Sequence, residues 1–215
     1  MGGRAEVFLP ARETEGYGLG LAAIERCFAE RGSPSAVLLT VDCGIGSVEE
    51  VEHLKQRGVE VIISDHHEPG PELPRADVLV NPRLGAAPGA EELCGAGVAF
   101  KIAHALVETG RRSGWYDGPP LGGELLVAAG LATVTDVVPL TGENRLLVWS
   151  AIRHWRRCAG TGLRALLSRA AQATVAAPDA YTFGYILGPR INAAGRMASA
   201  MVAYELMTTA DKDRA

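Results

Sequence analysis

Residues 61–67 read Val61-Ile62-Ile63-Ser64-Asp65-His66-His67, an apolar run that ends in a carboxylate and two imidazoles. A short, β-branched run of this kind is typical of a buried strand in a parallel sheet. A second run, Val37-Leu38-Leu39-Thr40-Val41-Asp42, also ends in a carboxylate. If the two runs are neighbouring parallel strands, their polar ends meet at one edge of the sheet, where open α/β sheets bind ligands.

The first third of the chain alternates strand and helix patterns. Strands are expected at 5–10, 36–42, 59–64 and 77–81, with helices near 19–31 and 47–57. Strands separated by helices of this length predict right-handed βαβ units and a parallel sheet. Helix spacing then dominates at 97–109, 121–134, 145–157, 163–170 and 201–208. The expected fold class is α/β, a parallel sheet flanked by helices and followed by a mainly helical segment.

The turn after Asp42 contains Gly44 and Gly46 and leads into Ser47-Val48-Glu49-Glu50. This S-x-x-E pattern predicts a capping box, in which the hydroxyl and the glutamate satisfy free backbone N–H groups. The same turn could present a helix N-terminus to a phosphate, or it could be a plain strand-to-helix turn.

Composition and charge argue against several classes of protein, although they leave a metal-assisted nuclease open. Hydrophobic residues make up 47% of the 215 residues, which argues against disorder, and a net charge of −4 gives no global field for nucleic acid. The four cysteines lie far apart without a CxxC pair, so we expect reduced thiols and no zinc ribbon. Because neither a signal peptide nor an apolar run of about 18 residues is found, we expect no membrane association and a cytoplasmic protein.

Carboxylate and imidazole groups at the sheet edge predict a site for divalent cations. Asp42, Asp65, His66 and His67 would supply the donor atoms, although an aspartate at a strand end can also cap the next helix. Adjacent side chains of an extended segment point in opposite directions. We therefore expect His66 and His67 to have different roles unless the chain turns there.

Two further segments carry polar groups in unusual surroundings. Asp136 follows the very apolar helix expected at 121–134, so it needs a cation, an arginine such as Arg145, or a helix N-terminus. The stretch at 188–196, Gly-Pro-Arg-Ile-Asn-Ala-Ala-Gly-Arg, sets arginines among small residues, which suits close approach of a phosphate. The alternative for this stretch is an irregular helix with exposed arginines.

An ordered set of motifs carries a resemblance to a known family. They are Val41-Asp42-Cys43-Gly44, Asp65-His66-His67, Thr135-Asp136-Val137-Val138-Pro139 and the 188–196 stretch. On the basis of these motifs and their order, the chain resembles the RecJ-type exonucleases of the DHH phosphoesterase superfamily over nearly all of its length. The resemblance implies a hydrolase that degrades single-stranded DNA from the 5′ end and releases mononucleotides in DNA repair and recombination. A single-strand-binding protein and a helicase are the implied partners.

The resemblance also implies roles for individual residues. It implies two Mn²⁺ or Mg²⁺ ions, with Asp42 bridging them and His66 and Asp136 as further ligands. His67 is implied either as another ligand or as a contact to the scissile phosphate, and all four are implied catalytic residues. Asp65 is expected to orient a histidine ligand by a hydrogen bond without contacting the metal itself. The implied substrate-binding residues are Arg12, Arg190, Asn192 and Arg196.

Members of the family carry an Asp-x-Asp-Gly strand ahead of the segment that begins at Ala5, and further domains after the core. We therefore expect residues 1–92 to form the α/β sheet region without its first strand. Residues 93–215 are expected to form the helical remainder of the core, truncated before the C-terminal associated domain. Such a chain should bind one cation well at most and be weak or inactive alone.

Two alternatives remain open. The first is a phosphodiesterase of the same superfamily that acts on oligonucleotides or cyclic dinucleotides. The second is a non-catalytic scaffold module with this fold, which the persistence of Asp42, His66, His67 and Asp136 disfavours.

Overall fold

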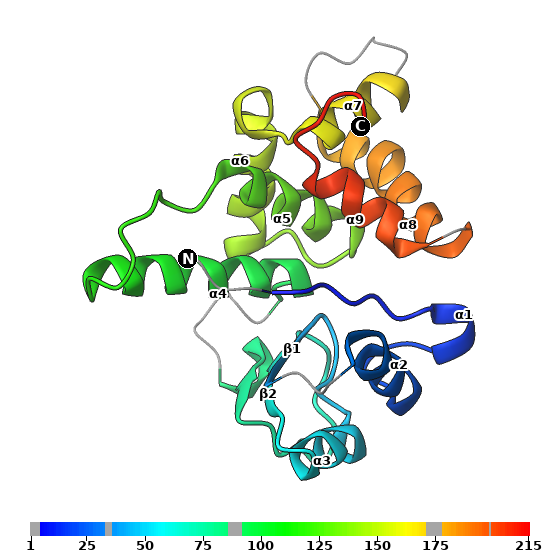
Figure 1. Cartoon of the computed structure of the whole chain (residues 1–215). Coiled ribbons are helices and arrows are strands. Elements are labelled where there is room, and N and C mark those ends of the chain that lie inside the picture. Colours follow the sequence, from blue (N-terminus) through cyan, green and yellow to red (C-terminus); the bar gives the residue numbers. More distant parts are fainter. Residues whose placement is uncertain (1–4, 33–35, 86–91, 171–177, 198) are drawn as a thin grey trace. The chain divides into compact units, whose positions relative to one another are not determined.

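The computed structural model describes residues 5–32, 36–85, 92–170, 178–197 and 199–215. It divides into two compact units, the first comprising the described residues up to Ala99 and the second running from Phe100 to Ala215. Helix α4 (Gly95–Arg112) carries the chain from one unit to the next. Figure 1 labels the α-helices of both units together with β1 and β2.

The described part of the first unit contains a parallel sheet in the order β1-β2-β3. The strands are β1 (Val37–Val41), β2 (Glu60–Ser64) and β3 (Val78–Val80). Val41 lies opposite Ser64, and Ser64 lies opposite Val80, so all three strands end level with one another. The residues that follow, Asp42, Asp65 and Asn81, therefore leave the sheet at one edge. The parallel sheet expected from the sequence is confirmed.

Helices α2 (Leu21–Arg31) and α3 (Val48–Gln56) cover one face of this sheet (Figure 1). Their apolar side chains form one core with alternate residues of β2 and with Val59, which precedes it: Ile24, Phe28, Val51, Leu54, Val59, Val61 and Ile63. Each fully buried side chain of this size contributes about 1.5–3 kcal/mol. This core fixes the position of β2. It therefore also fixes the position of the residues that follow β2 in the sequence.

Residues 5–10 do not form the expected strand. The guanidinium group of Arg26 on α2 lies 4.3 Å from the centre of the Phe8 ring and donates a hydrogen bond to the Leu9 carbonyl oxygen (3.2 Å). The short helix α1 (Arg12–Glu15) follows, and Glu15 pairs with Arg26 at 2.6 Å. The strand-like sequence was a poor guide because a helix side chain holds the segment, which pairs with no strand among the described residues.

The capping box expected at the start of α3 is also wrong. Ser47 occupies the N-cap position, but its hydroxyl makes no capping hydrogen bond and instead donates to the Leu19 carbonyl oxygen at 3.3 Å. A tertiary contact has replaced the local one, so Ser47 joins the start of α3 to the segment that precedes α2.

The second unit is helical. Its elements after α4 are α5 (Gly123–Thr135), α6 (Gly142–Cys158), α7 (Thr161–Ala170), the π-helix η2 (Thr182–Leu187), α8 (Gly188–Met197) and α9 (Ala200–Thr208). Buried side chains of α5, α6, α7 and η2 share one core, in which the Trp155 and Phe183 rings lie 5.7 Å apart. A Cβ at Gly130 would lie 2.3 Å from that of Ala151, so the contact between α5 and α6 requires glycine there. Within the described ranges, no helix combines the length and apolar character needed to cross a bilayer.

Candidate metal centre

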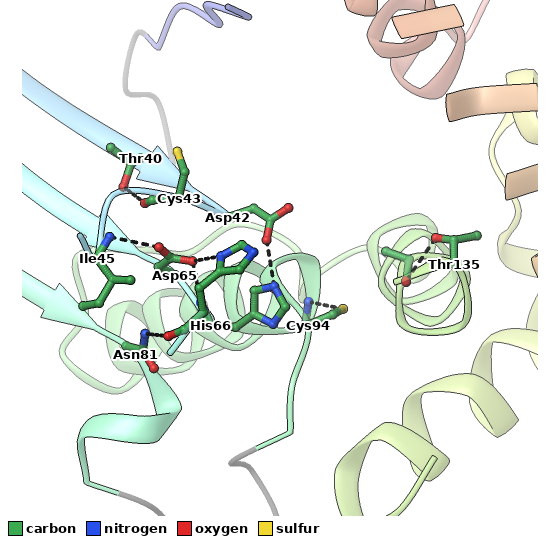
Figure 2. A network of polar contacts seen from close by, with 12 residues as sticks. Thr40, Asp42, Cys43, Ile45, Asp65, His66, Asn81, Cys94 and Thr135 are labelled. Carbon is green, nitrogen blue, oxygen red and sulfur yellow. Dashed lines mark hydrogen bonds and ion pairs between the residues drawn. The ribbon is translucent and has the colours of Figure 1, made fainter. Parts of the chain in front are cut away.

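The ends of β1 and β2 bring a carboxylate and two imidazoles together. His66 Nε2 lies 3.1 Å from Asp42 Oδ1, and Figure 2 shows the His66 ring turned towards the Asp42 side chain. One donor atom from each of Asp42, His66 and His67 lies within 4.8 Å of the others. The predicted meeting of these side chains at one edge of the sheet is thus seen, and their spacing makes the group a candidate site for one cation.

Asp42 adopts an unusual backbone conformation at this edge. Its φ angle is +66°, in the left-handed region that L-residues other than Asn and Asp rarely enter. Its N–H still donates to the Ser64 carbonyl oxygen at 2.9 Å, so the sheet ladder continues up to the turn. The turn leaves the Asp42 side chain 55% exposed, whereas His66 beside it is 11% exposed.

Asp65 is the buried anchor of the cluster. It is 1% exposed, and its Oδ2 accepts a hydrogen bond from the Ile45 N–H at 2.9 Å. Its Oδ1 accepts from the N–H groups of His66 and His67 (2.7 and 3.2 Å) and from the His67 ring (2.7 Å). Burial raises the pKa of Asp65, but the hydrogen bonds from Ile45, His67 and His66 outweigh it and lower the pKa overall. Asp65 is therefore an ionised carboxylate whose oxygens already have partners.

The contact with Asp65 fixes the state of the His67 ring. An ionised carboxylate only accepts hydrogen bonds, so His67 Nδ1 must carry the proton of their 2.7 Å contact. In the neutral ring the Nε2 lone pair is then available to a cation. The chain turns at this point, since both His66 and His67 donate their N–H groups to one oxygen, and the two rings lie 4.4 Å apart.

Two residues not singled out as site residues by the sequence hold this turn. Asn81, at the end of β3, is 8% exposed and donates from Nδ2 to the His67 carbonyl oxygen at 2.9 Å. Its Oδ1 accepts from the Arg83 N–H at 2.9 Å, and Arg83 Nε donates to the His66 carbonyl oxygen at 3.0 Å. The available signal was position, because Asn81 follows β3 as Asp42 follows β1 and Asp65 follows β2.

Cys43 lies next to the cluster but is a poor candidate for a ligand. Burial, followed by the nearby charges of Asp65 and Asp42, raises the pKa of the Cys43 thiol to about 11. The thiol is therefore protonated near neutral pH, whereas a thiolate is the form that binds metals. The donor set of this edge consists of carboxylate oxygen and imidazole nitrogen.

Asp136 lies in the second unit, and its approach to the cluster remains a prediction. It is the exposed C-cap residue of α5, and its N–H donates to the Ala132 carbonyl oxygen at 2.8 Å. The next residue, Val137, has a φ of +60° and is 86% exposed. Among the described residues other than glycine, only Asp42 and Val137 have positive φ angles, one at an expected ligand and one beside another.

The 188–196 stretch forms most of the regular helix α8. Arg190 and Asn192 are exposed there, and Arg190 Nη1 donates to the Ile186 carbonyl oxygen at 2.7 Å. A Cβ at Gly188 would lie 2.2 Å from Thr135 Cγ2, so the start of α8 lies against the end of α5. Within the second unit, α8, which carries Arg190, therefore begins beside Thr135, the residue before Asp136. The side chains of Arg12 and Arg196 lie outside what the structure describes.

The sequence matches one protein family over more than half of its length. A model described as the DHH family, N-terminal domain, matches residues 2–126, which include the whole sheet and its polar edge. The chain therefore belongs to the DHH family.

Known relatives narrow the resemblance further. The single-stranded-DNA-specific exonuclease RecJ of Bacillus subtilis (strain 168) is 38% identical over 209 residues, covering 97% of this chain and 25% of the relative. The protein of the same name from Escherichia coli (strain K12) is 40% identical over 212 residues, covering 94% of this chain and 35% of the relative. The chain thus spans a quarter to about a third of the length of these curated relatives.

Solved structures agree with this fold. An exonuclease RecJ bound to manganese matches with a TM-score of 0.78 at 35% identity, covering 96% of this chain and 49% of that one. RecJ in complex with Mn²⁺ from Thermus thermophilus matches with a TM-score of 0.73 at 35% identity, covering 89% and 27%. A parallel sheet with flanking helices and a mostly helical remainder is therefore the fold of the family as well as of this chain.

Proposed function

We propose that this chain is the core of a metal-dependent phosphodiesterase of RecJ type, which degrades single-stranded DNA from the 5′ end to mononucleotides. The observation that carries the proposal is the convergence of Asp42, His66 and His67 within 4.8 Å at the sheet edge of a DHH-family chain. Relatives that share 38–40% identity bear the name single-stranded-DNA-specific exonuclease.

The donor set fits a divalent cation that prefers oxygen and imidazole ligands. Asp42 would supply a carboxylate oxygen and His66 and His67 a ring nitrogen each, which suits Mn²⁺ or Mg²⁺. Two solved neighbours are described as RecJ with bound manganese. When bound, such cations polarise the phosphate and lower the pKa of a coordinated water. Asp42 would be shared between two cations, and Asp136 would be a further ligand.

The remaining residues position these groups and the substrate. Asp65 keeps the proton of His67 on Nδ1, so the ring presents Nε2 outward. Arg190, Asn192 and Arg196 on α8, and Arg12 on α1, would bind phosphates of the strand through their charged or amide groups. Phosphoryl transfer depends mainly on positioning and charge neutralisation, and these residues would provide both.

The wider setting of the activity is a further part of the proposal. We propose a role in DNA repair and recombination in the cytoplasm, with a single-strand-binding protein and a helicase as partners. The chain spans a quarter to about a third of these relatives, and the proposal is that full activity belongs to the longer protein. The chain by itself should therefore hydrolyse DNA weakly or not at all.

The test is a hydrolysis assay with Mn²⁺ on three labelled substrates: a long single strand, the matching duplex and a dinucleotide. With enzyme in excess, we expect at most slow cleavage, confined to the single strand and absent in His66→Ala. Preferential cleavage of the dinucleotide would favour a phosphodiesterase of small substrates instead. Rapid multiple turnover on the single strand would contradict the expected weakness of the chain alone.

A further inference from the structure

Gly95, the first residue of α4, lies buried against the Asp42 side chain. A Cβ built on Gly95 would lie 2.1 Å from Asp42 Oδ1, 2.5 Å from Cγ and 2.6 Å from Cβ. Ordinary carbon contacts are about 3.5–4.0 Å. A rotation of the Asp42 side chain could move the carboxylate away, but it could not move the Asp42 Cβ. Any residue other than glycine at position 95 must therefore displace the backbone.

The backbone of Asp42 has little freedom to move away. Its φ of +66° is already in a narrow allowed region, and its N–H is held by the Ser64 carbonyl oxygen at 2.9 Å. In the same turn, the Thr40 hydroxyl donates to the Cys43 carbonyl oxygen at 2.7 Å. The loop that carries Asp42 is thus fixed on both sides of the residue.

The start of α4 is fixed as well. Leu93 and Cys94, which precede Gly95, are 4% and 1% exposed, and the Gly97 N–H donates to Cys94 Sγ at 3.3 Å. The first N–H groups of a helix have no partner within the helix, and this end carries partial positive charge. A carboxylate in direct contact with the first residue of α4 is therefore favoured electrostatically as well as confined sterically.

We propose that Gly95 is a positioning residue for the metal centre: the absence of its side chain lets α4 approach closely enough to set the Asp42 carboxylate for cation binding. This inference rests on the proposed function for its metal, but the steric coupling between positions 95 and 42 can be measured without one.

The first test compares two glycine-to-alanine variants of the 215-residue chain by calorimetric titration with Mn²⁺. Gly46 lies exposed in the turn after Asp42, and a Cβ added there would meet no atom within 4 Å, so Gly46→Ala is the matched control. We expect Gly95→Ala to weaken Mn²⁺ binding by about 10–100-fold, as for other residues that orient ligands. Gly46→Ala should bind as the wild type does. Equal affinities in both variants would overturn the inference.

The second test is a double-mutant cycle in metal-free buffer. Asp42→Gly removes the three atoms nearest to the new Cβ, and glycine accepts the positive φ without strain. Gly95→Ala should lower the Tm of the wild-type chain, or prevent folding, yet leave the Tm of Asp42→Gly unchanged. An equal loss in both backgrounds would show that Gly95 packs against something else and would contradict the proposal. A wild-type chain that binds no Mn²⁺ would refute the metal centre while this cycle still decides the coupling.

Discussion

The Nδ1 atom of His67 lies 2.7 Å from Oδ1 of Asp65, and this contact joins an exposed imidazole to a buried carboxylate. The same oxygen accepts the N–H groups of His66 and His67, while Oδ2 accepts that of Ile45. Asp65 thus fixes the turn, the ring orientation and the proton position of His67 together. The stability of the sheet edge and its capacity to bind a cation should both depend on this one side chain.

Replacement of Asp65 by asparagine should separate these effects. The amide NH₂ group of the introduced side chain would face N–H donors, so we expect a loss of about 1–3 kcal/mol in the free energy of unfolding. We also expect Mn²⁺ affinity to fall by about 10–100-fold, because His67 loses its orienting partner. Asp77→Asn is the control, since Asp77 also accepts a strand N–H, that of Val61 (2.7 Å), away from the cluster. Asp77→Asn should lower stability but leave Mn²⁺ binding of the folded chain intact; equal Mn²⁺ binding in all three chains would refute the role of Asp65.

The contribution of Asp65 should depend on pH in the acidic range. Its pKa in the folded chain lies below the usual 3.8, because hydrogen bonds favour the charged form more than burial disfavours it. A group with a lowered folded pKa stabilises the fold above its unfolded pKa, and the contribution is lost as pH falls through the folded pKa. The stability difference between the wild type and Asp65→Asn, measured by urea unfolding, should be constant near neutrality and shrink below pH 3.8. A difference that grows on acidification would contradict this.

Asn81 should be required for the geometry of the turn at His66 and His67. Asn81→Ala removes the donor to the His67 carbonyl oxygen and the acceptor of the Arg83 N–H, both at 2.9 Å. We expect the variant to lose about 1–3 kcal/mol of stability and to bind Mn²⁺ more weakly. Gln56→Ala, at an exposed position of α3, should change stability by no more than about 0.5 kcal/mol. Wild-type unfolding and Mn²⁺ titration curves for Asn81→Ala would show that the turn holds without it.

Val137, beside Asp136, should be a site of backbone strain. A β-branched residue at φ +60° costs about 1–2 kcal/mol, and this one is 86% exposed, so burial offsets little of that cost. Asparagine tolerates this conformation, and Val137→Asn should therefore raise the Tm. Val202, exposed on α9 without a positive φ, gives the control, since Val202→Asn should not stabilise the chain. A lower Tm for Val137→Asn would show that Val137 makes stabilising contacts.

The sequence predicted those parts of the fold that depend on pattern and strand order. Two apolar runs joined by a helix predict neighbouring parallel strands. Because β1 and β2 end level with each other, the residues that follow them meet, and Asp42 contacts His66. Residues 5–10 carry a strand pattern as well, but pattern does not supply a partner, and Arg26 holds the segment instead.

The supporting residues could not be predicted in the same way. Ser47 matches a local capping motif but donates its hydroxyl hydrogen to Leu19, a contact that no local pattern encodes. The proposed role of Gly95 depends on the Asp42 side chain, which lies beside it although the two residues are far apart in the sequence. The π-helix η2 differs from an α-helix by a small change of period, which apolar spacing over six residues does not resolve.

Anomalous diffraction from crystals of this chain soaked in Mn²⁺ tests most directly whether the sheet edge binds a divalent cation. We expect a manganese peak with an Asp42 oxygen and a ring nitrogen each of His66 and His67 at about 2.0–2.5 Å. A saturating soak that places manganese elsewhere, or leaves no peak among these three side chains, would contradict it.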